Sequence, residues 1–314
     1  MAQAQSFYLA LFCRFITGIG SAFCFLGPIR IASRWFPPKR MALVTGIVVT
    51  LAMSGGMLAQ YPLTKLVLHV GWRHSLVYVG WLGMAMLLFM AYWIKDRPEP
   101  LEKAPKEQAE ISVIAAAKQA YFNLQTLRAA LYTSLMNMPV AVLGAMIGSL
   151  YLMQRLGVDK ESASMVNSML FLGAIVGGPV IGWYSDKIGL RKLPMKIGVC
   201  ATFIIFLCIL YLPVSLSGMG LLFFLLGFFS AAQVISYALV AESSPTAITA
   251  TAVSVVSIVT QGGYVIYQNL FSKLLIWHGD VKIVNGLPVY SFADYQAAAI
   301  MIPVGLIIAL LAIV

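Results

Sequence analysis

Residues 182–192 read Gly-Trp-Tyr-Ser-Asp-Lys-Ile-Gly-Leu-Arg-Lys and join two apolar runs, 164–184 and 194–213. Each run is about 20 residues long, the length at which a helix crosses the hydrocarbon core of a bilayer. The basic segment between them is typical of a cytoplasmic turn between two membrane helices. Outward from this turn, apolar runs and short polar segments alternate over the whole chain.

The composition excludes a water-soluble fold. Of 314 residues, 61% are hydrophobic and 10% charged, and the mean hydropathy is +0.89. Soluble domains are roughly half apolar and one quarter charged. The net charge of +10 is divided among short segments between the apolar runs, so it indicates membrane topology and no nucleic-acid partner. The cysteines lie inside apolar runs without metal-ligand spacing, so we expect no metal and no cofactor; they are Cys13, Cys24, Cys200 and Cys208.

The apolar runs predict an all-α integral membrane protein of about nine transmembrane helices. Helices are expected because lipid leaves an exposed strand edge unpaired, and no alternating pattern indicates a barrel. The predicted spans are 7–35, 42–64, 74–94, 127–152, 164–184, 194–213, 219–241, 247–271 and 295–314. The longest polar stretch, 95–126, ends in an Ala-rich run that could form a surface helix. We therefore predict an N-terminal bundle over 1–94, a cytoplasmic linker over 95–126 and a C-terminal bundle over 127–314.

The distribution of Lys and Arg predicts the orientation. Fourteen of these cations fall in one set of alternating loops and six in the other, so the first set is expected in the cytoplasm. With nine spans this places the N-terminus outside, although the first six residues carry no charge that would set it there. The chain also stops at Val314 inside an apolar run, so both ends look cut.

An internal repeat gives the same impression. At a spacing of 207 residues, Gly20 matches Gly227, Pro38 matches Pro245, and the pair at 55–56 matches the pair at 262–263. Parallel repeats of this size imply two six-helix halves related by an axis along the membrane normal. The spans between 127 and 213 have no counterpart in the first half, so about three helices are expected to be missing from the front of the chain.

These motifs resemble those of the major facilitator superfamily. Segment 182–192 fits the loop signature G-x-x-x-D-[RK]-x-G-x-[RK]-[RK] at every defined position, and residues 14–22 resemble the fourth-helix motif R-x-x-x-G-x-G-x-A. The helix over 46–56 is similar to the family's fifth, and Gly-Trp-Arg at 71–73 to its exit toward the sixth. The resemblance implies helices 4 to 12 of a twelve-helix carrier that works by alternating access. The signature positions, which in the family hold the two halves together in one state, are Gly182, Asp186, Lys187, Gly189, Arg191 and Lys192.

The signature loop also has a physical interpretation. Its Asp186 can pair with Arg191 or accept hydrogen bonds from a helix N-terminus. By the internal repeat, the partner of the whole signature loop should lie at the start of the second span, near Lys39 and Arg40. Glu242, at the cytoplasmic end of the seventh span, is expected to pair with a basic loop. Glycines inside the spans are expected to let helices pack closely. They are Gly18, Gly20, Gly55, Gly56, Gly262 and Gly263.

Polar side chains inside the spans are candidates for a solute cavity. Arg14 is the cation in the first span and would suit a carboxylate on the solute, unless it reaches to the outer interface. The neutral candidates could orient a polar ligand near the bilayer midplane or join helices to each other. They are Gln60, Asn137, Gln233, Tyr237, Gln261, Tyr264 and Gln268.

Together these features predict a secondary transporter of a small polar organic solute, with amino acids, short peptides or organic anions favoured. A sugar or other metabolite carrier of the same family and a non-transporting truncated remnant remain alternatives. No enzyme is expected, because no buried nucleophile, phosphate loop or metal cluster is evident. All Asp and Glu fall in loops or at span ends, so the sequence leaves open whether a proton or ion is co-transported. It also leaves the oligomeric state open. The partners are the small-molecule solute and the lipid bilayer, and the expected location is a bacterial inner membrane.

Overall fold

Helices make up nearly all of the described chain, and they end where polar segments interrupt the apolar runs. The computed structural model describes residues 2–35, 41–94, 113–245, 248–278, 282–284 and 287–313. They divide into two units, Met1–Glu107 and Gln108–Val314. Six helical stretches of this described part are both long and apolar enough to cross a membrane. The helical membrane fold predicted from the sequence is therefore confirmed.

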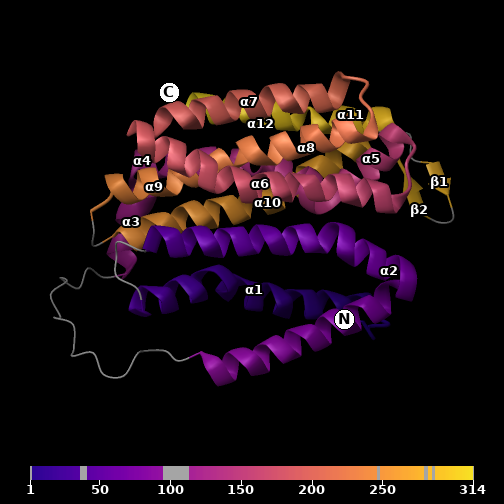
Figure 1. The fold of residues 1–314 in the computed structure, drawn as a ribbon, viewed down its shortest axis with the longest axis horizontal. Coiled ribbons are helices and arrows are strands. Elements are labelled where there is room, and N and C mark those ends of the chain that lie inside the picture. The colour runs from indigo at the N-terminus through magenta and orange to yellow at the C-terminus, as the bar shows by residue number, and fades with distance from the viewer. Residues whose placement is uncertain are drawn as a thin grey trace. The chain divides into compact units, whose positions relative to one another are not determined.

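The first unit contains α1 (Phe7–Trp35) and α2 (Met41–Trp93). α2 consists of two helical arms joined at Gly71, and these arms correspond to the predicted spans 42–64 and 74–94. Gly71 has φ 80° and ψ 158°, a conformation that a Cβ atom would make costly. Helical geometry continues on both sides of this residue, so the predicted loop is reduced to one glycine. Figure 1 shows α2 turning back on itself at this bend.

The second unit is built around one long helical stretch. This stretch consists of α4 (Leu124–Met136), the π-helix η2 (Val140–Ile147) and α5 (Gly148–Leu156), and it follows the short helix α3 (Val113–Phe122). Its most apolar window is 78% buried, whereas that of Ile47–Trp93 in α2 is 6% buried. The α4–α5 stretch is therefore the centre of its unit. Residues 95–112 of the predicted linker lie outside the described residues.

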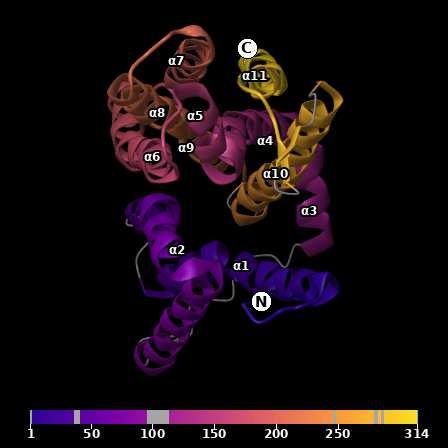
Figure 2. The same cartoon turned by 90° about the vertical axis from the view of Figure 1, so that its right-hand side faces the viewer.

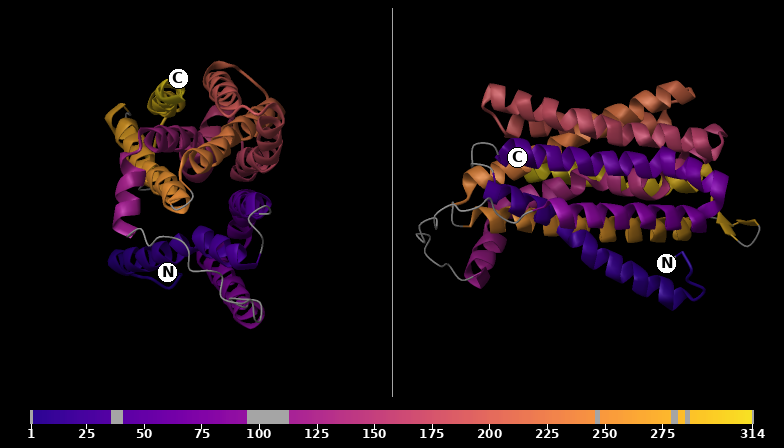
Figure 3. Two further views of the ribbon diagram at one scale, coloured as in Figure 1. Left: turned by 90° about the vertical axis from the view of Figure 1, so that its left-hand side faces the viewer. Right: turned by 60° about the horizontal axis from the view of Figure 1, so that its bottom comes forward.

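The other helices of this unit surround the central stretch. Seen along the helix axes, α6 and α8 lie on one side of α4 and α10 on the other, and the view from the opposite end agrees (Figures 2 and 3). These helices are α6 (Lys160–Ile188), α7 (Lys192–Tyr211), α8 (Leu216–Ser230), the 3₁₀ turn η3 (Ala231–Gln233), α9 (Val234–Ser243), α10 (Thr249–His278), α11 (Phe292–Ala299) and α12 (Met301–Ile313).

Short polar residues and glycines set the helix ends. The Asn123 side chain accepts hydrogen bonds from the first turn of α4, Asp159 does so for α6, and Ser291 forms a capping box on α11. Gly157 and Gly189 end α5 and α6 with φ of 64° and 66°, the left-handed conformation that commonly closes a helix.

The closest helix pair of this unit is α6 and α8. A Cβ added at Gly173 would collide with the Phe224 carbonyl, and one added at Gly227 would collide with the Leu170 carbonyl. Gly177 packs in the same way one turn further along. Small residues four apart let two membrane helices approach until their backbones touch. The sequence analysis did not single out Gly173 and Gly177, although their spacing is the signal that would have identified them.

The connection between α10 and α11 contains a hairpin that was not predicted. Strands β1 (Lys282–Val284) and β2 (Leu287–Val289) form a short antiparallel hairpin between α10 and α11, with Lys282 opposite Val289. Three-residue strands are too short to register as a strand pattern in the sequence. The hairpin lies at the same end of the unit as α5 and α11 (Figure 1).

Candidate functional site

A row of polar side chains joins α4 and α10 inside the apolar second unit. The Tyr264 hydroxyl donates to Asn137 Oδ1 at 3.3 Å, and Gln268 Nε2 donates to the Ala141 carbonyl at 3.2 Å. One turn away, the hydroxyls of Tyr267 and Ser134 are 2.7 Å apart. The structure thus brings together three of the residues proposed from the sequence, Asn137, Tyr264 and Gln268, along one helix interface.

The break in the central helix explains why this row forms there. α4 ends at Met136, Pro139 has no N–H to donate, and the chain then continues as the π-helix η2. The Ala141 carbonyl of η2 accepts a side-chain hydrogen bond from Gln268 of α10. In lipid such a backbone group must be satisfied by protein or by a polar cavity. The polar residues of α10 satisfy it here.

A second break brings α8 and α9 to the same interface. The 3₁₀ turn η3 ends at Gln233, and Ser236 donates to the Gln233 carbonyl at 2.6 Å while also hydrogen-bonding to Thr133 of α4. The Gln233 side chain is 8% exposed, and its Oε1 has no hydrogen-bond partner among the described residues. An unsatisfied buried acceptor costs about 1–3 kcal/mol, so Gln233 is suited to receive a donor from a ligand or water.

Tyr237 links α9 to α10. It packs against a buried cluster that includes Val240 and Val256, and it interacts with Ser257, Thr260 and Tyr264 of α10. We use the name polar seam for Asn137, Tyr264 and Gln268, which hydrogen-bond between the central stretch and α10, together with Tyr237 and with Gln233, whose backbone carbonyl is linked to α4 through Ser236 and Thr133. Its first and last members in the sequence, Asn137 and Gln268, are 131 positions apart.

Other sequence candidates lie elsewhere. Gln261 is exposed on α10, and among the described residues no hydrogen bond joins its side chain to the polar seam. Arg14 is exposed on α1, and Gln60 is half-buried on α2, both in the first unit. The structure describes them only within that unit.

The signature loop forms an ion-pair network between α6, α7 and α9. Arg191 Nη1 is 2.5 Å from Asp186 Oδ1, and the same guanidinium binds both carboxylate oxygens of Glu242, at 2.6 and 3.2 Å. It also donates to Ser185 Oγ at 3.1 Å. The hydrogen bonds that Arg191 donates to Glu242, followed by the one it donates to Asp186, raise the pKa of Arg191 above its already high ordinary value.

The remaining signature positions have simpler roles. Gly189 is the left-handed residue that lets α6 end and the chain turn toward α7. The Lys187 ammonium lies 5.0 Å from the centre of the Trp183 ring, Lys192 is the first residue of α7, and Gly182 lies in α6 with open space around it. Glu242 pairs with the basic loop as expected. The expected partner region around Lys39 and Arg40 lies outside the described residues.

The glycines predicted to allow close packing behave differently from one another. A Cβ at Gly263 would collide with Ser134 Oγ of α4, so this glycine lets α10 approach the central helix. At Gly18, Gly20, Gly55 and Gly262 an added Cβ would meet no described atom within 4 Å, because these positions face open space in their own units. Gly56 lies beside Gly55 in α2.

The opposite end of the second unit carries a cluster that the sequence analysis missed. Arg155 donates to the carbonyls of Leu210 and Leu212 at 2.9 and 2.6 Å and to the Tyr151 hydroxyl at 2.7 Å. Tyr151 donates to Ile209 O at 3.0 Å. These contacts satisfy carbonyls at the C-terminus of α7. The four-residue spacing of Tyr151 and Arg155 was the available signal, since it places both on one helix face.

No metal-ligand cluster is formed by the described residues: no group of three or more His, Cys, Asp or Glu side chains comes together there. The cysteines of this part of the chain are all free. Asp294 is buried at the start of α11, held by Ser291 and 3.9 Å from His278.

Comparison with protein families identifies the family to which this chain belongs. The profile of the Major Facilitator Superfamily matches residues 1–149 and 129–314, which together span the chain. The chain belongs to the Major Facilitator Superfamily. Since its helices are long and apolar, it is an integral membrane protein.

Among curated members of this superfamily, the chain is 27% identical over 188 residues to the membrane sensor protein UhpC of Salmonella typhimurium, covering 55% of this chain and 42% of that protein. It is 24% identical over 238 residues to the probable galactarate/D-glucarate transporter GudP of Escherichia coli, covering 64% and 51% of the two chains. The chain thus spans about half the length of these superfamily members.

Solved superfamily structures share the fold. A bacterial homologue of the human lysosomal transporter Spinster, inward-facing and unoccupied, matches with a TM-score of 0.75 at 17% identity, covering 99% of this chain and 78% of that one. The nucleoside transporter NupG (D323A mutant) matches with a TM-score of 0.58 at 16% identity, covering 88% and 66% of the two chains. At these identities the likeness concerns the fold alone.

Proposed function

We propose that this chain belongs to a secondary transporter, and not to an enzyme, that moves a small polar organic solute across a bacterial inner membrane by alternating access. The observation that carries the proposal is the polar seam. Hydrogen-bonding side chains of α4, α9 and α10 meet at helix breaks inside an apolar bundle, and the buried Gln233 Oε1 is left without a partner among the described residues. Transporter sites are typically built at broken helices of this kind.

The favoured solutes are amino acids, short peptides and organic anions, and among these we favour organic anions. Amide and tyrosine groups of the seam can bind carboxylate or hydroxyl oxygens, and Arg14 on α1 would suit a carboxylate. The names of several relatives favour the same class, since these proteins include a probable galactarate/D-glucarate transporter, a probable sulfoacetate transporter and a monocarboxylate transporter. Sugars remain the second class. One relative, UhpC, is named as a membrane sensor and not as a transporter. Binding without transport is therefore the alternative to test.

We further propose that the signature loop controls the opening of the cytoplasmic side. Arg191 joins α6, α7 and α9 through Asp186 and Glu242, and these exposed ion pairs can form and break at low cost. A cluster of this kind is suited to a contact that exists in one state of a rocking cycle and is lost in the other.

The proposal is tested by uptake into proteoliposomes. Labelled dicarboxylate, amino acid, dipeptide and sugar are compared, each with and without an inward proton gradient, which also measures coupling. Gln233→Ala and Tyr264→Phe each remove one hydrogen-bonding group and should raise KM by about 5–30-fold, the equivalent of about 1–2 kcal/mol. Arg14→Ala should reduce uptake of anionic solutes most.

A matched control is Asn269→Ala. Asn269 is also an α10 amide, but it is exposed and donates to the Val265 carbonyl of its own helix at 2.8 Å. Its replacement should leave KM unchanged. Equal effects of the Gln233 and Asn269 variants would exclude the seam as the solute site, and solute binding without uptake would favour the non-transporting alternative.

A further inference from the structure

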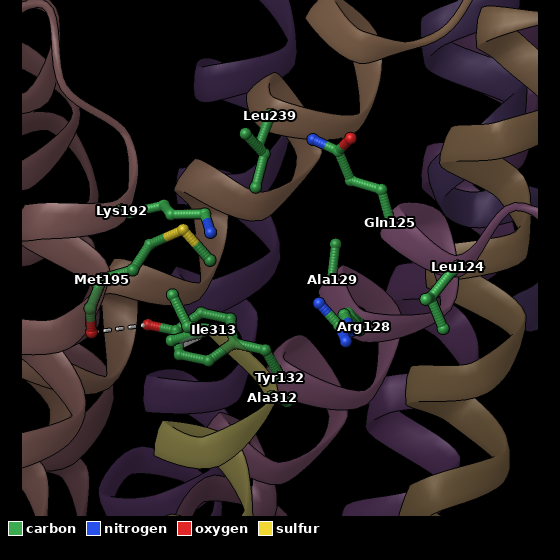
Figure 4. A pocket seen from close by; sticks show the side chains of 10 residues that line it. All are labelled: Leu124, Gln125, Arg128, Ala129, Tyr132, Lys192, Met195, Leu239, Ala312 and Ile313. Carbon is green, nitrogen blue, oxygen red and sulfur yellow. Dashed lines mark hydrogen bonds between the residues drawn. The ribbon is translucent and has the colours of Figure 1, made fainter.

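A cavity at the signature-loop end of the second unit carries cations that neither the polar seam nor the ion-pair network uses. Its volume is about 490 Å³, and it lies between the starts of α4 and α7 and the ends of α9 and α12. Arg128 of α4 and Lys192 of α7 both line it. Figure 4 shows the guanidinium and the ammonium pointing into the same space from opposite sides.

The electrostatic character of this cavity is positive. Its lining contains no carboxylate, and no ion pair of Arg128 or Lys192 is found within the described part of the chain. α7 begins at Lys192 without a side-chain cap, which adds the partial positive charge of a helix N-terminus. Gln125 supplies a further donor, whereas the Tyr132 hydroxyl is already used by Met195 O at 3.2 Å. An anion placed here would meet two cations and an amide donor.

The rest of the lining is apolar. Leu124, Met195, Leu239 and Ile313 form hydrophobic walls beside the two cations. A second cavity of about 510 Å³ adjoins the first through Lys192 and Leu239 and adds Lys196. A free inorganic anion would not be stabilised by contact with these apolar walls. A molecule with an anionic head group and a hydrocarbon tail can contact both the cations and the apolar walls.

The position in the membrane agrees with such a ligand. This end of the unit carries the cations of the 187–196 segment, and the positive-inside rule places it at the cytoplasmic surface. Basic pockets between transmembrane helices at that surface are suited to the head groups of anionic lipids. We propose that the cavity binds the phosphate head group of an anionic phospholipid of the cytoplasmic leaflet, with Arg128 and Lys192 as its ligands. The inference goes beyond the proposed function and does not depend on the identity of the solute, although Lys192 also belongs to the signature loop.

The experiment measures lipid preference and needs no transported solute. The protein is equilibrated with equimolar phosphatidylglycerol and phosphatidylcholine in detergent, and the lipids it retains are counted by native mass spectrometry. The wild type should retain phosphatidylglycerol preferentially. Each cation near an anionic lipid contributes about a fivefold factor, so Arg128→Gln should lower the preference about fivefold and the double change with Lys192→Gln about 25-fold.

A charge-matched control separates this site from general attraction. Lys160→Gln with Lys273→Gln removes the same charge from exposed positions nearer the other end of the unit and should leave the preference unchanged. Equal loss in both double variants would overturn the proposal. So would equal retention of the two lipids by the wild type, a result that holds even if a variant folds poorly. Displacement of phosphatidylglycerol by inorganic phosphate at equal concentration would instead assign the cavity to free phosphate.

Discussion

Replacing Arg155 with alanine should destabilise the second unit, because this side chain holds the C-terminus of α7. α7 ends at Tyr211, and the last carbonyls of a helix have no partner within it. Arg155 donates to Leu210 O at 2.9 Å and to Leu212 O at 2.6 Å, and thereby ties α7 to the end of the central stretch. Gln296 of α11 donates to the same Leu210 carbonyl at 3.0 Å.

The magnitude follows from these contacts. A hydrogen bond to a charged group contributes about 1.5–3 kcal/mol. Arg155 is half-buried, so water replaces part of what is lost, and Gln296 still serves Leu210 O. We expect a net loss of about 2–3 kcal/mol from the two carbonyl contacts. For a domain of this size, each kcal/mol lowers the melting temperature by about 2–4 °C, so the apparent Tm should fall by about 4–12 °C.

The assay is thermal unfolding of the purified protein in detergent, followed by intrinsic fluorescence at one fixed heating rate. Arg155→Lys should give an intermediate loss, because one ammonium group lacks the planar fork that reaches both carbonyls. Gln154→Ala is the control, since its side chain is the exposed neighbour. If the Arg155→Ala and Gln154→Ala proteins unfold at the same temperature, the cap does not stabilise α7 and the reasoning is wrong.

Three further outcomes are expected. Gly173→Ala should lower the melting temperature, because the added methyl group overpacks the α6–α8 contact and reduces the free energy of unfolding by about 1–3 kcal/mol. Gly178→Ala on the same helix places its methyl group in open space and should have little effect. Similar melting temperatures of the two variants would contradict close packing of α6 and α8. Hydrogen bonds, chiefly from Ser162, hold the pKa of Asp159 below its ordinary value, so the cap on α6 should contribute stability above that value and lose it as pH falls through the folded-state pKa. Asp159→Asn keeps the cap without the titration and should flatten this pH dependence, and an unchanged acid limb would argue against it. A double-mutant cycle of Arg191→Gln and Glu242→Gln should give a coupling of at most about 1 kcal/mol that weakens with salt, because Glu242 is half exposed; a larger, salt-independent coupling would mean a buried pair.

Local sequence features were sufficient for the helices and for the signature loop. The apolar runs predicted the spans because the length and hydrophobicity of a membrane helix are properties of one continuous segment. The pairing of Arg191 with Asp186 was likewise predictable from the sequence, because a five-residue separation across a glycine turn keeps the two groups close to each other. Only the connection between the two arms of α2 is shorter than predicted, because a single positive-φ glycine, Gly71, is sufficient to join them.

The candidate site depended on packing. Gln261 and Tyr264 looked equally suitable on one helix, yet only Tyr264 meets Asn137, because the rotation of α10 against α4 is set where Gly263 packs against Ser134. The sequence by itself determined the apolar segments, their ends, the charge asymmetry and the family, because each depends on neighbours along the chain. Only the tertiary structure decided which polar groups meet, which side chains bind carbonyls at the helix breaks, and where Arg128 and Lys192 share a cavity. Those outcomes depend on the rotation and depth of helices packed against one another, and no single segment contains that information.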